Sequence, residues 1–187
     1  MASPSEAGPV TARAERVVAL TETRRPTLGG GRLVCVDGPA GSGKTTLAAE
    51  VGRLTGARVL HMDDLYPGLG GMRRVEPHVL GILRPLAEGR PGSYRRYDWH
   101  AGEYAEEHVV RPAPLLVLEG VASAGLAWAA LVTTLVWVEA DRDVRFRRGL
   151  ARDGEAAREH WLRWMAEEDR LFADHRTRER ADLVLTT

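Results

Sequence analysis

The residues best suited to chemistry lie in one short segment, Gly38-Pro39-Ala40-Gly41-Ser42-Gly43-Lys44-Thr45. The segment matches the pattern G-x-x-x-x-G-K-[ST], the P-loop, at every fixed position, and the backbone N–H groups of such a loop surround phosphates. Lys44 is the single lysine among 26 basic residues, the others being arginines. A compact ammonium reaches between two phosphates as a point charge, whereas a planar guanidinium does not fit the same space. The segment therefore predicts that the chain binds a nucleoside triphosphate.

The residues on either side favour a P-loop over an ordinary glycine-rich turn. Residues 32–37 form a short β-branched run typical of a buried strand, and residues 45–54 show the apolar spacing of a helix. Lys44 would contact the β- and γ-phosphates, and the Thr45 hydroxyl would bind Mg²⁺. We therefore expect ATP to contact the eight residues of the segment together with Thr46, and we expect the Lys44 side chain to face solvent.

Composition favours one domain that acts on a small molecule. The chain has 187 residues and a formal net charge of zero, so nothing suggests non-specific binding to nucleic acids or anionic membranes. The single cysteine, Cys35, lies in a predicted strand and excludes a disulfide within one chain. No apolar run approaches the roughly 18 residues of a membrane span, and no signal peptide is apparent. We expect a soluble cytoplasmic protein, with homo-oligomerisation left open.

The pattern along the chain predicts two parts. Residues 1–30 would form an arm, disordered over residues 1–10, with a short helix over residues 11–23, and residues 31–187 would form the catalytic domain. Within that domain we expect strands over 32–37, 57–62, 115–120, 131–138 and 181–185, and helices over 45–54, 75–88, 141–153 and 155–175. Continuous apolar strands alternating with helices indicate an α/β fold with a parallel sheet covered on both faces. Together with the P-loop segment, this pattern predicts a fold of the P-loop NTPase type.

Carboxylates follow three of the predicted strands: Asp37, the pair Asp63 and Asp64, and Glu119. The carboxyl ends of parallel strands meet at one edge of a sheet, where ligands bind. Phosphoryl transfer to an alcohol needs a carboxylate that orients the hydroxyl and accepts its proton, and a metal that neutralises the phosphates. The aspartate pair could supply the base, and Glu119 with Thr45 the metal site. A simple turn after the strand is the alternative for the pair.

Three arginines, Arg145, Arg148 and Arg152, share one face of a predicted helix. Guanidinium groups on a closing segment would stabilise the charge on a transferring phosphoryl group, so the helix is predicted to be an arginine-rich lid. A solvated basic face balanced by neighbouring aspartates is the alternative.

Four further motifs, in order along the chain, resemble those of uridine-cytidine kinases. They are Met62-Asp63-Asp64-Leu65-Tyr66, Tyr97-Asp98-Trp99, Leu118-Glu119-Gly120-Val121 and the lid arginines. The wider group includes phosphoribulokinase and the P-loop pantothenate kinases, and the resemblance covers about residues 32–187. It implies a five-stranded parallel core with a lid helix, and transfer of the γ-phosphoryl group of ATP to a primary hydroxyl.

The resemblance also implies a role for each matching residue. Asp63 would be the base and Glu119 the carboxylate near Mg²⁺, while Asp64 remains a second candidate for the base. The remaining matches are the acceptor-side tyrosines Tyr66 and Tyr97 and the lid arginines Arg148 and Arg152.

Two departures from the family concern the acceptor. The family keeps a pyrimidine-reading histidine shortly after its Y-D-F segment, where this chain has Gly102, and the nearest histidine is His100. The lid is also shorter after Asp153. We therefore expect an ATP- and Mg²⁺-dependent kinase of a nucleoside or nucleoside-like metabolite other than plain uridine, with His100 as an acceptor contact or an exposed loop residue. A kinase of a non-nucleoside alcohol and a non-catalytic ATP-binding switch remain alternatives.

Overall fold

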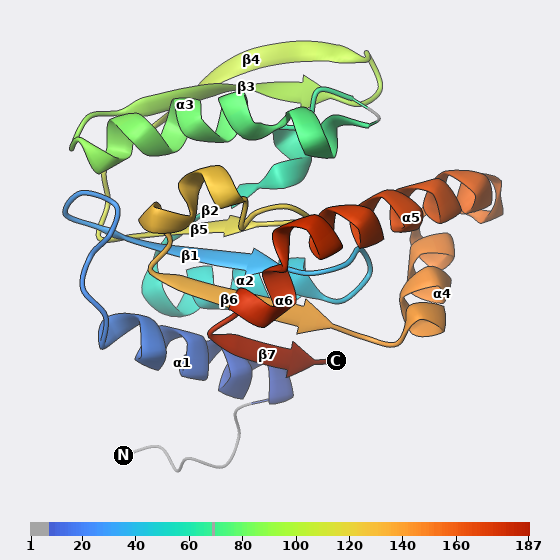
Figure 1. Ribbon diagram of the computed structural model, residues 1–187, viewed down its shortest axis with the longest axis horizontal. Coiled ribbons are helices and arrows are strands. Elements are labelled where there is room, and N and C mark those ends of the chain that lie inside the picture. Colours follow the sequence, from blue (N-terminus) through green and yellow to red (C-terminus); the bar gives the residue numbers. More distant parts are fainter. Residues whose placement is uncertain (1–7, 69) are drawn as a thin grey trace.

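A five-stranded parallel sheet with helices on both faces organises the chain (Figure 1). The computed structural model describes residues 8–68 and 70–187. The strands lie in the order β2-β5-β1-β6-β7, with bounds β1 Arg32–Asp37, β2 Arg58–His61, β5 Leu115–Glu119, β6 Thr134–Glu139 and β7 Leu183–Thr186. The predicted α/β fold with a parallel sheet is confirmed.

The helices follow the sequence pattern closely. Their bounds are α1 Pro9–Glu22, α2 Lys44–Thr55, α3 Glu76–Ala87, α4 Arg142–Asp153, α5 Arg158–His175 and α6 Thr177–Arg180, with short 3₁₀ turns at Met62–Asp64, Gly71–Arg74, Leu126–Leu131 and Glu155–Ala157. The predicted disorder of residues 1–10 is wrong at its end, because Pro9 already begins α1; residues 1–7 lie outside the described residues. None of the described helices combines the length and apolar character needed to cross a membrane.

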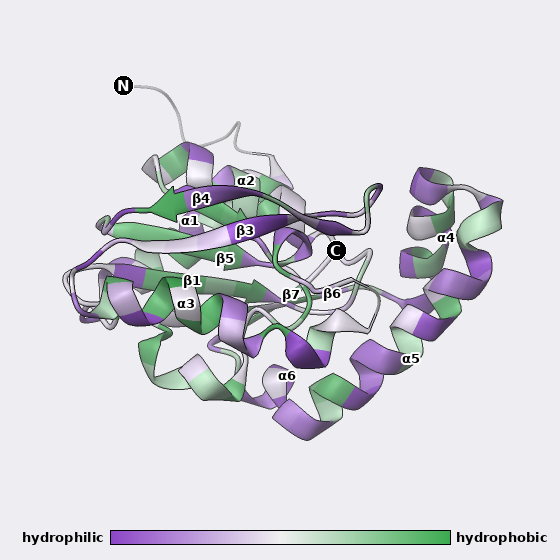
Figure 2. Ribbon diagram, turned by 90° about the horizontal axis from the view of Figure 1, so that it is seen from above, coloured by the Kyte–Doolittle hydropathy of each residue, from purple (hydrophilic) through white to green (hydrophobic). Residues whose placement is uncertain are grey.

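Alternating side chains of β1 build one core on each face of the sheet. Leu33 and Cys35 pack into a core that also holds apolar residues of α3, the loops after β2 and β5, and Leu171 of α5. Val34 and Val36 pack on the opposite face with residues of α1 and α2. Figure 2 shows the hydrophobic colour concentrated on the central strands. The period of two in a strand thus fixes which helices cover each face.

An antiparallel hairpin that the sequence pattern did not predict packs beside α3. It consists of β3 (Gly92–Asp98) and β4 (Glu103–Val110), paired from Gly92↔Val110 to Asp98↔Glu103. Both strands are mostly polar (Figure 2), so their residues show no clear apolar alternation. Edge hairpins with two partly solvated faces lack the signal on which strand prediction depends.

Helices α4 and α5 extend beyond the carboxyl ends of the strands (Figure 1). Asp141 is the N-cap of α4, because its side chain accepts hydrogen bonds from the N–H groups of Asp143 and Val144. The ring of Trp161 in α5 packs directly on Gly149 of α4, where a Cβ atom would lie 2.3 Å from the ring. This close contact fixes the angle between the two helices and places their residues over the P-loop.

Asp37 does not face the phosphate site as its position at the end of β1 suggests. Its side chain is completely buried and accepts hydrogen bonds from the N–H groups of Gly38 (2.7 Å), Ala122 (3.1 Å) and Ala124 (2.9 Å). Burial raises its pKa to about 6, although the three N–H groups and Lys44 act in the opposite direction. Asp37 therefore joins the P-loop to the loop after β5.

We predict that Asp37→Asn lowers the free energy of unfolding by about 1–3 kcal/mol, because an amide turns an N–H group toward backbone donors that need an acceptor. The pKa of Asp37 is higher in the folded than in the unfolded protein, so its protonation favours folding. The stability advantage of the wild type over D37N should therefore shrink as the pH rises from about 4 to about 6. Urea unfolding at several pH values measures both effects. Equal stability at every pH would contradict the role of Asp37 as a backbone acceptor.

Candidate active site

The P-loop passes so close to its neighbours that two of its glycines admit no side chain. At Gly38 (φ +136°) a Cβ atom would lie 2.1 Å from the carbonyl oxygen of Val138, and at Gly41 (φ +77°) 2.7 Å from that of Arg145. Helix α2 begins at Lys44, so the N–H groups of its first turn face the loop. The loop therefore forms the anion-binding end of a helix, as its sequence predicts.

Lys44 is buried, with 6% of its surface exposed, which corrects the expectation that it faces solvent. Its Nζ atom donates a hydrogen bond to the carbonyl oxygen of Pro39 at 2.9 Å. Burial lowers its pKa, while the carboxylates of Asp37, Glu119 and other residues oppose that shift. The buried Ser42 hydroxyl has no hydrogen-bond partner among the described residues. A buried cation and an unpartnered hydroxyl in a loop of N–H donors fit the phosphates of ATP.

A cavity of about 320 Å³ lies over this loop. Five sequence-predicted side chains line it, from four different parts of the chain: Lys44, Thr45, Asp63, Glu119 and Arg152. The remaining lining residues are Ala40, Gly41, Trp99, Gly120, Val121, Asp153, His160, Trp161 and Trp164. The fold thus brings the predicted base, metal ligands and cations to one place. Thr46 lies exposed in the first turn of α2 and does not line the cavity.

Glu119 stands between Thr45 and His61 at the end of β5. The Thr45 hydroxyl lies 3.2 and 3.3 Å from the two carboxylate oxygens, and His61 Nδ1 lies 2.6 Å from Oε1. The hydrogen bond to Glu119 is the main cause that raises the pKa of His61. Strand pairing places His61 directly beside Glu119, a contact that the sequence analysis missed.

The oxygens of Thr45 and Glu119 fit a magnesium ion, a hard cation that prefers oxygen ligands. Within residues 8–68 and 70–187, no group of three or more His, Cys, Asp or Glu side chains could hold a metal by itself. Magnesium in nucleotide sites is commonly held by one or two protein ligands together with substrate phosphates and water. Thr45 and Glu119 match that smaller set.

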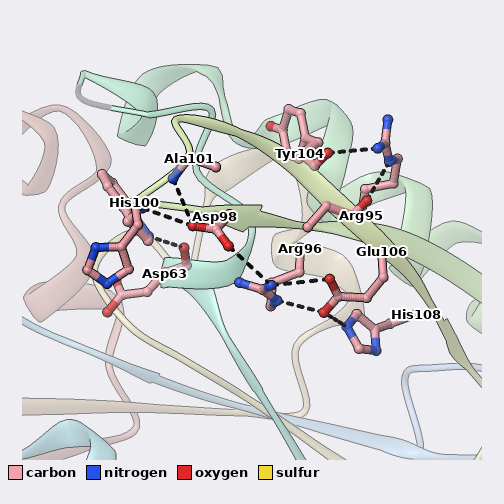
Figure 3. Close-up of polar contacts among 11 residues, drawn as sticks. Asp63, Arg95, Arg96, Asp98, His100, Ala101, Tyr104, Glu106 and His108 are labelled. Atoms are coloured by element: carbon pink, nitrogen blue, oxygen red, sulfur yellow. Dashed lines mark hydrogen bonds and ion pairs between the residues drawn. The ribbon is translucent and has the colours of Figure 1, made fainter.

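The Asp63 side chain is exposed into the cavity, whereas Asp64 does not line it. Partial loss of hydration raises the pKa of the Asp63 carboxyl, and Glu119 adds to the increase, while Lys44 and Arg152 oppose it. The backbone carbonyl of Asp63 accepts a hydrogen bond from the indole N–H of Trp99 at 2.9 Å. The turn of the β3–β4 hairpin therefore reaches the site beside Asp63 (Figure 3).

The three lid arginines have different environments. Arg152 lines the cavity, pairs with Asp153 at 2.7 Å and is largely exposed. Arg148 lies outside the cavity and donates to the carbonyl oxygen of Gly41 at 3.2 Å and to the Thr187 hydroxyl at 3.0 Å. The third, Arg145, is buried where α4 packs against α5 and the P-loop. Although they share one helical face, a single arginine of the three reaches the cavity.

Apart from Asp63, the acceptor residues predicted from the sequence do not line the cavity. Tyr66 is completely buried, and its hydroxyl donates to the carbonyl oxygen of Val121. Tyr97 packs edge-on against Trp99, with ring centroids 5.3 Å apart. His100 is exposed, and its backbone N–H donates a hydrogen bond to the Asp98 carboxylate (Figure 3).

Other aromatic residues line the cavity instead, one of them in the Tyr97-Asp98-Trp99 motif itself. Trp99 comes from the hairpin turn, and His160, Trp161 and Trp164 come from α5. The tryptophans of α5 show the apolar spacing of a core helix, and Trp161 is indeed buried. Their spacing in sequence therefore does not distinguish a core position from a cavity wall. Their location directly after the lid is the one sequence feature that could have indicated a site.

Comparison with known proteins gives one family match and several structures of similar fold. Residues 78–163 match the model of the Phosphoribulokinase / Uridine kinase family. No curated protein sequence matches the chain. A solved structure from Bacillus stearothermophilus, named as a possible uridine kinase, has 20% identity and a TM-score of 0.63, covering 93% of this chain and 99% of that chain.

Two further solved structures have the same fold. One, from Silicibacter sp. TM1040, is named as a kinase proposed for a fructose transport system; it has 21% identity and a TM-score of 0.60, covering 95% of this chain and 98% of that chain. The D-glycerate 3-kinase of Cryptococcus neoformans has 14% identity and a TM-score of 0.54, covering 91% and 87%. At these identities the structures show the fold alone. The family match confirms the predicted resemblance to the uridine kinase and phosphoribulokinase group.

Proposed function

We propose that the protein transfers the γ-phosphoryl group of ATP, with Mg²⁺, to a hydroxyl of a nucleoside or nucleoside-like metabolite. The observation that carries the proposal is the convergence of Lys44, Asp63, Glu119 and Arg152 on one cavity above the P-loop. Phosphoryl transfer needs a cation at the phosphates, a base for the acceptor and neutralisation of the developing charge. A nucleotide-binding switch needs neither an acceptor-side base nor a lid arginine.

Each residue has a defined task in this reaction. Lys44 and the N–H groups at the start of α2 hold the phosphates. Asp63 orients the acceptor hydroxyl and takes its proton as the oxygen attacks phosphorus, and its raised pKa brings it closer to the working pH of a general base. Arg152 lines the cavity and is largely exposed, so it can approach the transferred group. Magnesium held by Thr45 and Glu119 would neutralise phosphate charge.

The cavity walls support an acceptor that carries a ring. Trp99 is 42% exposed, and Trp164 and His160, which line the same cavity, are half-buried. Flat aromatic faces stack on planar rings, and an imidazole can donate or accept a hydrogen bond. An extended pantothenate-like chain would use these faces less well. The observation therefore favours a nucleoside-like acceptor over the non-nucleoside alternative.

The first prediction that tests this function concerns Lys44. We expect Lys44→Ala to abolish phosphoryl transfer, because it removes the cation that contacts the phosphates. The fold should be kept, because the substitution removes a buried charge and leaves none in its place. Lys44→Arg should also reduce turnover severely, because the guanidinium does not fit between the phosphates. Steady-state ADP formation measures both. Arg53→Lys, an exchange of the same kind at an exposed position of α2, serves as the control and should have wild-type turnover. Near-wild-type turnover of K44R would contradict the assignment.

The second prediction compares the neighbouring aspartates. Asp63→Asn should leave ATP binding nearly unchanged and lower the transfer rate by about 10²-fold or more, the scale of losing a positioned base. Asp64→Asn is the matched control and should have a smaller effect, because Asp64 does not line the cavity. Single-turnover kinetics at saturating ATP separates chemistry from binding. The reverse ranking would make Asp64 the base.

The third prediction concerns the acceptor. With nucleosides, pantothenate and sugars offered separately, ADP release above the rate without acceptor should occur for a ring-bearing, nucleoside-like alcohol. Uridine and cytidine should be poor substrates, because His100 lies outside the cavity. A kcat/KM of about 10⁴ M⁻¹s⁻¹ or more for either would refute that expectation. Stimulation by pantothenate alone would favour the alternative acceptor, and ATP binding without stimulation by any acceptor would favour a switch.

A further inference from the structure

A buried ion pair joins the two helices that extend over the site. Arg145 of α4 and Glu168 of α5 lie 2.9 Å apart, and their side chains are 6% and 0% exposed. Neither residue lines the cavity, so neither has a task in the reaction described above. Moving two charges out of water is costly and needs close geometry and further hydrogen bonds. The partners that satisfy this pair therefore indicate what it does.

Both members of the pair bind the backbone of the same P-loop residue, Ala40. Glu168 Oε2 accepts the N–H of Ala40 at 2.8 Å, and Arg145 Nη1 donates to the carbonyl oxygen of Ala40 at 3.2 Å. Arg145 Nε also donates to the carbonyl oxygen of Ala140, just before α4. Ala40 lies directly before Gly41, one of the two P-loop glycines that leave no room for a side chain. The ion pair thus holds both polar groups of one P-loop residue.

This contact has a consequence for the phosphates. The N–H of Ala40 donates to Glu168, so it does not point at a phosphate. The backbone N–H groups that remain for the phosphates of ATP are those of the residues after Ala40. Those N–H groups keep their direction only if the backbone of Ala40 keeps its conformation. A positional error of about 1 Å in such a group costs roughly 10²-fold in a reaction that depends on alignment.

We infer that Glu168, together with Arg145, is a positioning residue that sets the phosphate-binding conformation of the P-loop from the lid side of the molecule. The inference rests on the proposed binding of ATP at this loop. Glu168 follows Trp161 and Trp164 at helical spacing, so one side of α5 contacts both the cavity and the loop. Loss of the pair should weaken the ATP side of the reaction and spare the acceptor side.

A second ion pair between the same helices provides a matched control. Arg142 of α4 and Asp169 of α5 lie 2.8 Å apart, but their side chains are 53% and 51% exposed, and no hydrogen bond joins them to the P-loop in the described residues. Asp169→Asn therefore removes an interhelical ion pair without disturbing Ala40. Glu168→Gln keeps size and an acceptor oxygen, but it removes the charge that faces Arg145.

The experiment measures the Kd of Mg·ATP by titration calorimetry and the KM values of both substrates for the wild type, E168Q and D169N. We expect E168Q to raise the Kd and the KM of ATP about tenfold or more, with the acceptor KM within about twofold of wild type, and D169N to leave all three values unchanged. A purely structural role would lower the melting temperature without this split. Equal ATP affinity in E168Q and D169N would overturn the inference.

A double variant keeps the inference testable if E168Q fails to fold. Replacing both charges by methionine in R145M/E168M leaves no unpaired buried charge, which is often neutral for stability. This variant should fold and still bind Mg·ATP about tenfold more weakly or worse, because nothing holds Ala40. Wild-type affinity in the double variant would overturn the inference. Failure of the wild type to bind ATP would instead refute the proposed function.

Discussion

The burial of one cation among carboxylates is the interaction on which the rest of the site depends. Lys44 is almost inaccessible to solvent, and Asp37, Glu119, Glu168 and Asp63 all act to keep it charged against the cost of burial. A buried charge is tolerated only where opposite charges and hydrogen bonds compensate it. The P-loop, the carboxyl ends of the strands and α5 must therefore keep fixed positions relative to one another. This requirement explains why segments distant in sequence meet at one lysine.

The carboxylates at the ends of the parallel strands have different roles because successive side chains of a strand point to opposite faces of the sheet. Glu119 pairs in register with Val36, and the two lie on the side of the sheet that faces α2 and Thr45. Asp37 comes one residue later in β1 and faces the opposite side, where it binds backbone N–H groups. A shift of one residue thus separates a candidate metal ligand from a structural acceptor.

The elements that the sequence pattern predicted well are those with a strong local signal. The strand at 32–37 and the helix after Lys44 were expected within a residue or two of their observed bounds, because apolar runs and periodicity are local properties. The β3–β4 hairpin was missed because its residues are polar on both faces. The last predicted strand before the lid began too early, since Leu131 belongs to a 3₁₀ turn.

The sequence by itself determined the P-loop, the parallel α/β fold and the convergence of Asp63 and Glu119 at one sheet edge. Each follows from residue types at fixed spacing or from the direction of parallel strands. The tertiary structure alone decided which side chains reach the cavity. Tyr66 matches an acceptor motif yet lies in the core, Arg145 shares a face with Arg152 yet is buried against Glu168, and His160 carried no signal yet lines the cavity. The exposure of these side chains depends on how α4, α5 and the hairpin pack over the sheet, and packing between distant segments leaves no mark in local spacing.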